Sequence, residues 1–337
     1  MSSRPLPDRW TEDASWLAQA IDPRAGLIRL VRMDEAAYRG ASFLDDRMLG
    51  AGLEARLASL AEAMAEASQI GRDDARWIFH IGHVGSTLIA RLLGELDNVI
   101  SIREPRSLRD LIYVPPEERA DVAARLGRMM SRTFQPGQFA LVKATSFVSE
   151  LAPLLAPRAP ALFLYASPRN YIAGILAGEN SVKELAALHQ LRSERLHGRG
   201  IELVGYDGSN AHRAAAAWAC EMTSLESAFD AVSGANILWA DFDAMLDDMV
   251  GWLGRCARHF GFAAPAEQVR EVVAGPLMRR YSKALEYDYS PSLRAELLDE
   301  AATLHRAEIA DALNMLRRDA GRVPILARAL ERAEREG

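Results

Sequence analysis

The sequence predicts a doubly wound α/β fold, in which a parallel β-sheet carries helices on both faces. Short apolar segments alternate with stretches of helical periodicity at residues 77–81, 99–102, 139–142, 161–165 and 237–240. The first segment is aromatic and β-branched, which is typical of a strand buried on both faces. With 49% hydrophobic and 26% charged residues, the composition is that of a globular protein.

The region before the first of these strands, residues 1–74, is predicted to be an N-terminal appendage packed on the core. Residues 27–33 have the composition of a short strand, and residues 53–67 carry apolar side chains at helical spacing. Trp10 and Trp16 are expected to be packing residues.

A tight turn joins the first core strand to the helical pattern of Leu88, Leu92 and Leu93, and it reads Gly82, His83, Val84, Gly85, Ser86, Thr87. A strand that passes through such a turn into a helix directs free N–H groups and the positive end of the helix dipole at one place. The turn therefore predicts an anion site. The alternative is a structural turn whose glycines only permit the chain reversal.

The ordinary nucleotide loop, G-x-x-x-x-G-K-[ST], carries a lysine directly after its second glycine. Here Gly82 and Gly85 are three apart and Ser86 follows with no lysine. The order of strand, Gly-Ser-Thr and helix resembles the 5′-phosphosulfate loop of sulfotransferases that use 3′-phosphoadenosine 5′-phosphosulfate (PAPS). In that family a lysine or arginine stands where this chain has His83. The resemblance implies a P-loop NTPase-like fold of the sulfotransferase type, with residues 82–87 binding the donor.

Glu104 follows the second strand and is the candidate general base, because ligands gather at the carboxyl ends of parallel strands. The alternative is a carboxylate that caps the next helix or pairs with Arg106 or Arg109. The Glu104-Pro105 pair is similar to a segment in the carbohydrate and bacterial branches of the family.

After the third strand, Lys143 matches the lysine of the Lys-Thr-His stretch of cytosolic sulfotransferases, and the resemblance assigns it a catalytic role. Thr145 stands where those enzymes carry the catalytic histidine, and a threonine is no base at neutral pH. His83 is the alternative base, or a proton donor facing the leaving group.

The resemblance assigns the 3′-phosphate of the donor to Arg169, which follows the fourth strand, and to Arg280 and Lys283 in a late cationic cluster. The serine that the family places eight residues after the arginine is Ala177 here. For the cluster, the alternative is exposed surface. The charged residues 184–199 are interpreted as a solvated helix or as a flap across the site.

The resemblance covers residues 76–283. It implies a sulfotransferase-like P-loop domain at residues 75–290, with the amphipathic helices of residues 291–337 packed on the same domain. The expected activity is transfer of a sulfuryl group from PAPS to a hydroxyl or amine of a small-molecule, carbohydrate or peptide acceptor. Two alternatives are a P-loop kinase of a small metabolite, disfavoured by the missing loop lysine, and a nucleotide-binding or interaction protein without catalysis.

Several other classes are disfavoured. A net charge of −6 argues against a nucleic-acid binder, and there is no apolar run of membrane-spanning length. Cys220 and Cys256 are isolated, which suits a reducing compartment, and a cytoplasmic location is expected. No metal is expected, because His80 and His83 would not converge on one ion from an extended strand. The acceptor and the oligomeric state stay open.

Overall fold

The computed structural model describes residues 4–47, 52–232, 236–280 and 290–335. Five strands form one sheet in the order β5-β6-β4-β7-β8, and every neighbouring pair is parallel. They are β4 (Arg76–His80), β5 (Val99–Arg103), β6 (Phe139–Lys143), β7 (Ala161–Tyr165) and β8 (Ile237–Asp241). All five predicted strands are therefore confirmed, within one residue at each end.

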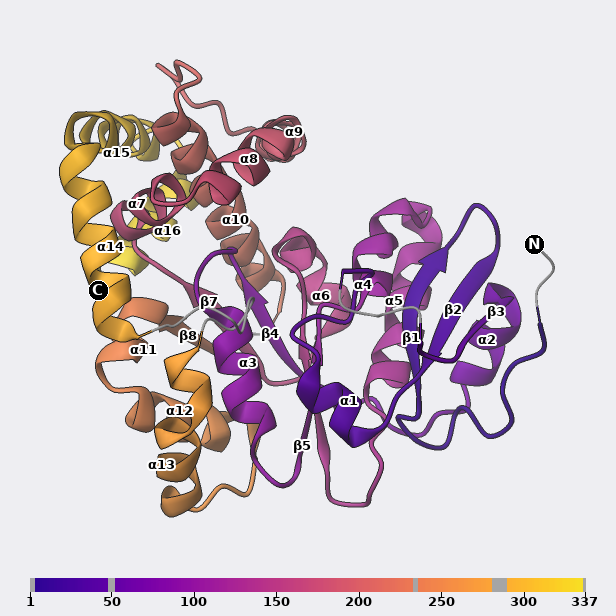
Figure 1. Cartoon of the computed structure of the whole chain (residues 1–337). Helices are drawn as coiled ribbons and strands as arrows, with labels where there is room; N and C mark the ends of the chain where they lie inside the picture. Colours follow the sequence, from indigo (N-terminus) through magenta and orange to yellow (C-terminus); the bar gives the residue numbers. More distant parts are fainter. Residues whose placement is uncertain (1–3, 48–51, 233–235, 281–289, 336–337) are drawn as a thin grey trace.

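Helices cover both faces of this sheet (Figure 1), so the predicted doubly wound α/β fold is confirmed. On one face α3 (Ser86–Gly94) packs against α12 (Met249–Phe260), and on the other α10 (Asn210–Ala231) packs against β4. From β4 the chain crosses to the β5 edge, and it later passes β4 to reach β7 and β8. The strand order thus reverses beside β4, and such a switch point leaves a crevice at the carboxyl ends of the strands.

The N-terminal region holds a second sheet, which is antiparallel and has the order β1-β2-β3. Its strands are β1 (Trp16–Asp22), β2 (Leu27–Arg32) and β3 (Ala55–Ser59). The strand predicted at residues 27–33 is confirmed. The helix predicted at residues 53–67 is wrong in its first half, because Ala55–Ser59 pairs with β2 and only α2 (Leu60–Ala67) is helical. The strand β1 was not predicted.

Buried hydrogen bonds fasten this N-terminal sheet to the core. Arg132 donates to the carbonyl of Trp16 over 2.6 Å, and Ser107 donates to the carbonyl of Ala18 over 2.6 Å. Arg103, at the end of β5, is fully buried and donates to the carbonyl of Ala41 over 2.9 Å. Burial lowers the pKa of this guanidinium to about 9. The Arg103 bond, together with the bond from the N–H of Leu44 to the carbonyl of Arg103 over 2.8 Å, holds residues 41–44 against the carboxyl end of β5.

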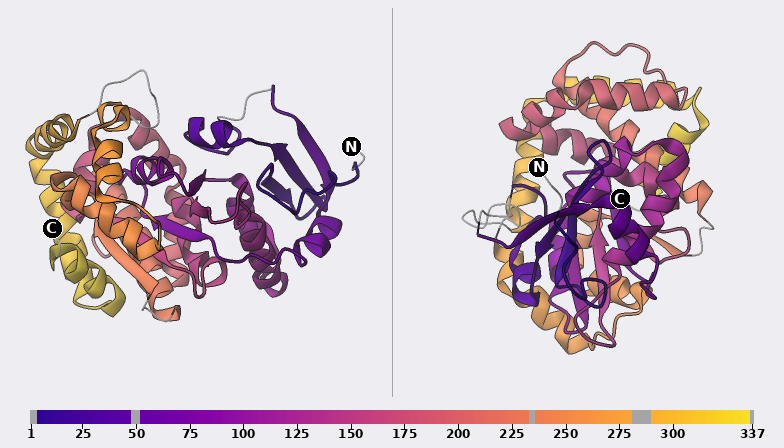
Figure 2. Two further views of the ribbon diagram at one scale, coloured as in Figure 1. Left: turned by 90° about the horizontal axis from the view of Figure 1, so that it is seen from below. Right: turned by 90° about the vertical axis from the view of Figure 1, so that its right-hand side faces the viewer.

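The remaining elements surround this frame (Figure 2), and the helices predicted at residues 116–134 and after residue 291 are confirmed. No described helix is long and apolar enough to cross a membrane. The bounds are α1 (Glu35–Gly40), α4 (Arg106–Asp110), η1 (Leu111–Tyr113), α5 (Pro116–Met130), η2 (Ser146–Leu151), α6 (Ala152–Leu155), α7 (Pro168–Leu176), α8 (Glu179–Ala187), α9 (His189–Gly198), α11 (Phe242–Asp247), α13 (Ala266–Ala274), η4 (Pro276–Arg279), α14 (Pro291–Leu304), α15 (Arg306–Ala320) and α16 (Pro324–Arg335).

Candidate functional site

The loop between β4 and α3 has an unusual backbone. Gly82, His83 and Gly85 have φ angles of 81°, 54° and 62°, and Gly85 caps the helix. A left-handed conformation suits glycine but strains a histidine, and such outliers concentrate at functional sites. A Cβ at Gly85 would lie 1.9 Å from Cζ of Phe242, so only glycine fits beneath that ring. Shape and strain together fix the path of the loop.

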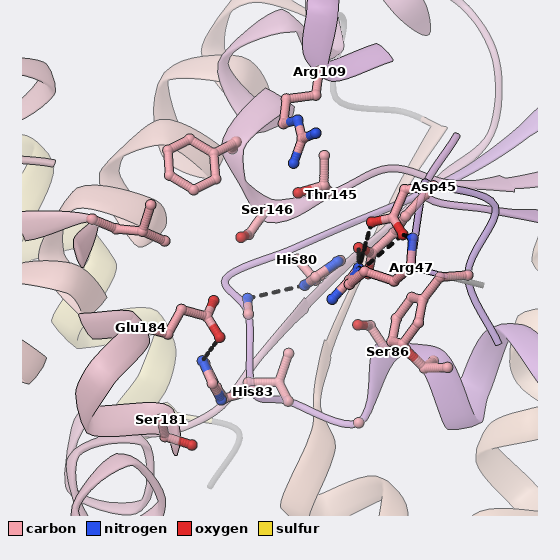
Figure 3. Close-up of a pocket in the computed structure, with 18 of the residues that line it drawn as sticks. Asp45, Arg47, His80, His83, Ser86, Arg109, Thr145, Ser146, Ser181 and Glu184 are labelled. Atoms are coloured by element: carbon pink, nitrogen blue, oxygen red, sulfur yellow. Dashed lines mark hydrogen bonds and ion pairs between the residues drawn. The ribbon is translucent and has the colours of Figure 1, made fainter. Parts of the chain in front are cut away.

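The N-terminus of α3 offers several unused donors. No described residue accepts a hydrogen bond from the N–H groups of Gly85, Ser86 or Thr87, which are among the free donors at the start of any helix. The Ser86 hydroxyl lines the pocket (Figure 3) and makes no bond within the described residues. The hydroxyl oxygen of Thr87 is buried and has no partner. A buried oxygen left unsatisfied is costly, so this arrangement fits a bound anion.

His80 fixes the start of this loop. Its Nδ1 accepts from the N–H of Gly82 over 2.9 Å, and its Nε2 lies 3.0 Å from the carbonyl oxygen of Ala144. Nε2 must then carry the proton, since a carbonyl can only accept. Both ring nitrogens are engaged with backbone groups, and so His80 ties the loop after β4 to the end of β6.

A pocket of about 610 Å³ opens in front of the loop. Figure 3 shows that several segments far apart in the sequence contribute to its wall. Besides residues 82–87 and Glu104, the lining includes Phe43, Asp45, Asp46, Arg47, Arg106, Arg109, Ile112, Tyr113, Thr145, Ser146, Phe147, Ser181, Glu184, Leu188, Leu191, Arg192, Phe242 and Arg294. All six predicted loop residues and the candidate base therefore face one cavity.

Glu104 also has a positive φ, of 53°, and its carboxylate lies between two cations. Lys143 is fully buried at the end of β6, and its Nζ donates a hydrogen bond to Oε1 of Glu104. A guanidinium nitrogen of Arg47 lies 3.3 Å from Oε2 of Glu104. The pairing with Arg106 or Arg109, considered above as the alternative to a general base, is not found among the described residues. Lys143 itself does not line the pocket, whereas its partner Glu104 does.

Helices α8 and α9 form one wall of the pocket. Nε2 of His83 lies 3.7 Å from a carboxylate oxygen of Glu184 on α8. On α9, Arg192 lines the pocket and pairs with the fully buried Glu221 of α10 over 3.3 Å, while Arg195 pairs with the same carboxylate over 3.0 Å. The charged stretch at residues 184–199 thus lies across the site and is anchored to α10.

Neither of the two predicted 3′-phosphate residues that the structure describes lines this pocket. Arg169 and Arg280 are exposed and do not line it, and Lys283 lies outside the described residues. A different cation, Arg294 of α14, lines the pocket beside the loop. Its guanidinium lies 5.0 Å from the centre of the Phe242 ring, and its Nε donates to Asp243 over 2.9 Å.

Sequence reasoning missed Arg47, Arg192, Phe242 and Arg294 as pocket residues. Each reaches the site from a segment remote from the loop motif. Arg192 lies in the charged stretch 184–199, for which a flap across the site was one interpretation, and no local pattern marks the other three. Arg109 was considered only as a partner of Glu104. Its place in the first turns after Glu104-Pro105 was the one available signal.

One cluster of possible metal ligands, Asp207, His212 and Asp311, occurs among the described residues. The buried His212 ring has Nδ1 2.7 Å from Asp207 and Nε2 3.2 Å from Asp311. Nδ1 also accepts the N–H of Asp207 over 3.1 Å. None of the three residues lines the pocket described above.

No family model and no curated protein matches the chain. Solved structures of three sulfotransferases are similar to it. The "Sulfotransferase Domain from the Curacin Biosynthetic Pathway" is 11% identical, with a TM-score of 0.42 over 67% of this chain and 89% of that chain. Sulfotransferase STF1 from Mycobacterium tuberculosis is 12% identical, with a TM-score of 0.38 over 73% and 79%. Mouse sulfotransferase SULT7A1, complexed with PAP, is 10% identical, with a TM-score of 0.40 over 80% and 93%.

Proposed function

We propose that the protein is a sulfotransferase that moves a sulfuryl group from PAPS to a hydroxyl or amine of an acceptor. The observation that carries the proposal is the glycine loop after β4. It directs the free N–H groups of Gly85, Ser86 and Thr87 and an unpartnered buried hydroxyl toward a pocket large enough for a nucleotide-sized ligand.

The same loop argues against an ATP-dependent kinase. Its second glycine is followed by Ser86, where a nucleotide loop of the ordinary kind has a lysine for the β- and γ-phosphates. The nearby Lys143 is bonded to Glu104 and does not line the pocket. A phosphosulfate carries less charge than a triphosphate, and a loop of N–H groups with one histidine suits it better.

In the proposed reaction, the acceptor oxygen attacks the sulfur in line with the bridging oxygen of the donor. The new S–O bond forms as the S–O bond to the bridge breaks, and the bonding pair leaves with PAP. Glu104 accepts the acceptor's proton, and Lys143 and Arg47 hold that carboxylate in place. The loop N–H groups bind the anionic oxygens, and His83 faces the leaving bridge oxygen as a donor.

We keep Arg169, Arg280 and Lys283 as the proposed ligands of the 3′-phosphate. A planar guanidinium offers paired donors to a phosphate, and the exposed Arg169 is available for a ligand that extends out of the pocket. The Arg169→Ala variant should lose selectivity for PAP over AMP. An equal loss of affinity for PAP and for AMP would show that Arg169 does not bind the 3′-phosphate.

Calorimetric titration with PAP, AMP, ADP and ATP tests the proposal. We expect PAP to bind most tightly, because it alone combines a 5′-phosphate with a 3′-phosphate. Tighter binding of ATP would favour a kinase. No binding of any of the four nucleotides would leave an interaction protein as the better interpretation.

A further inference from the structure

The side of the pocket opposite the glycine loop includes α4 and η1, from which Arg109, Ile112 and Tyr113 line it. In Figure 3, Arg109 extends toward Thr145 and Ser146 from the side opposite His83 and Ser86. Because α4 begins two residues after Glu104, this side lies next to the proposed base. An acceptor that gives its proton to Glu104 would extend into it.

Three arginines that line the pocket, Arg47, Arg106 and Arg109, differ in the carboxylates with which they form ion pairs. Arg47 pairs with Asp45 over 2.7 Å and with Glu104 over 3.3 Å. Arg106 pairs with Asp46 over 2.7 Å and with Asp110 over 3.3 Å. Arg109 is exposed, and no described residue forms a hydrogen bond or an ion pair with it. Among these three arginines, Arg109 is the one that forms no ion pair with a described carboxylate, although the charge of its neighbour Asp110 acts on it through space.

Apolar surface accompanies this cation. Ile112 and Phe147 line the pocket, and Tyr113, next to Ile112 in η1, also lines it and is 60% exposed. An exposed aromatic side chain beside apolar neighbours suits a flat ring, since stacked and edge-on aromatic pairs are favourable. The charge and the apolar surface together define one kind of ligand.

On the basis of the proposed function, we propose that the acceptor is a hydroxylated aromatic compound that carries a carboxylate, and that Arg109 binds this carboxylate. The phenolic oxygen would lie at Glu104 and attack sulfur, and the carboxylate would pair with the guanidinium in a charge-assisted hydrogen bond. Arg109 thus selects for an anionic acceptor.

The test uses para-hydroxyphenylacetate and its uncharged amide, which have the same shape. Each is titrated into the PAP-loaded protein, as wild type, Arg109→Ala, Arg109→Lys and Arg270→Ala. Arg270 is an exposed arginine on α13 that does not line the pocket and serves as the control. We expect the wild type and the control to bind the carboxylate about 10-fold more tightly than the amide. Arg109→Ala should lose this preference, Arg109→Lys should retain part of it, and the Kd of PAP should be the same in all four proteins.

Three results would overturn the inference. The first is a preference for the carboxylate that persists in Arg109→Ala. The second is a failure of both compounds to bind the wild type, which would remove this acceptor class. The third is a loss of PAP affinity relative to AMP in Arg109→Ala, which would assign Arg109 to the donor's 3′-phosphate. Failure of the proposed function is a separate result, because it is a failure of wild-type protein to bind PAP before any acceptor is added.

Discussion

Removal of the Ser86 hydroxyl from the glycine loop should weaken ligand binding without changing the stability of the fold. Ser86 lines the pocket and makes no hydrogen bond with any described residue, so the Ser86→Ala variant loses no described interaction of the free protein. A hydrogen bond from this hydroxyl to a charged phosphosulfate is worth about 1.5–3 kcal/mol. The Kd of PAP should therefore rise about 10- to 150-fold, while the free energy of unfolding stays close to that of the wild type.

Ser131 provides a matched control with the opposite pattern. Its hydroxyl is buried at the end of α5, accepts from the N–H of Ala75 over 3.0 Å and donates to the carbonyl of Gly127 over 2.8 Å. The Ser131→Ala variant leaves the buried N–H of Ala75 without its acceptor, whereas the carbonyl of Gly127 keeps the backbone N–H of residue 131 as a donor. The variant should lose about 1–3 kcal/mol of unfolding free energy. Its affinity for PAP should be that of the wild type, because Ser131 does not line the pocket.

The assay is isothermal titration with PAP, together with urea unfolding of each free protein. An unchanged Kd in Ser86→Ala would refute the assignment of this hydroxyl to the donor. Substitutions of Gly85 are unsuitable for this purpose, since any side chain would collide with Phe242 and disturb the loop itself.

Three further predictions follow from charged groups. The Glu104→Gln variant should lower turnover about 10²- to 10⁴-fold and preserve the affinity for PAP. The Glu104→Gln/Lys143→Met double variant should be equally inactive. If the double variant recovers turnover, Glu104 serves only as the ion-pair partner of the buried Lys143. Burial, together with the nearby charge of Asp243, raises the pKa of Asp241 to about 6 from its ordinary 3.8. The protonated carboxyl group therefore contributes its full stabilisation below about pH 4. As the pH rises through about 6, the free energy of unfolding should fall by up to about 3 kcal/mol. In urea unfolding across this pH range, the Asp241→Asn variant should not show this decrease in unfolding free energy. A decrease identical to that of the wild type would show that Asp241 is not the titrating group. Glu221→Gln leaves the guanidinium groups on α9 without their buried partner and should cost about 3–5 kcal/mol of unfolding free energy; a loss under about 1 kcal/mol would show that this pairing does not anchor the helix.

The pairing of strands explains where the sequence was insufficient for the N-terminal region. Residues 55–59 carry helical spacing, yet they form β3, because the edge of β2 offers a ladder of backbone partners from Val31 to Leu27. Such a partner lies far away in the sequence, and its pairing outweighs a weak local propensity. For the same reason β1, whose alternation is poor, was not predicted.

The sequence by itself determined the five core strands and the glycine loop. Each strand is a continuous apolar run, and the loop depends on local conformational rules that act on neighbouring residues. It also determined that Glu104 follows the second core strand. These features depend on residues that are close together along the chain, and so local sequence patterns are sufficient to predict them. The expectation that the second core strand lies next to the loop strand was wrong, because β6 pairs between β5 and β4.

Only the tertiary structure decided the environment of these residues. It gave Glu104 the partners Lys143 and Arg47 instead of its neighbours in sequence, and it left Arg109 without an ion pair to any residue that the structure describes. It also brought Arg294 to the loop from a helix more than half the chain away. Ion pairs and pocket walls depend on which segments the fold places together, and the spacing of residues along the chain does not encode that choice.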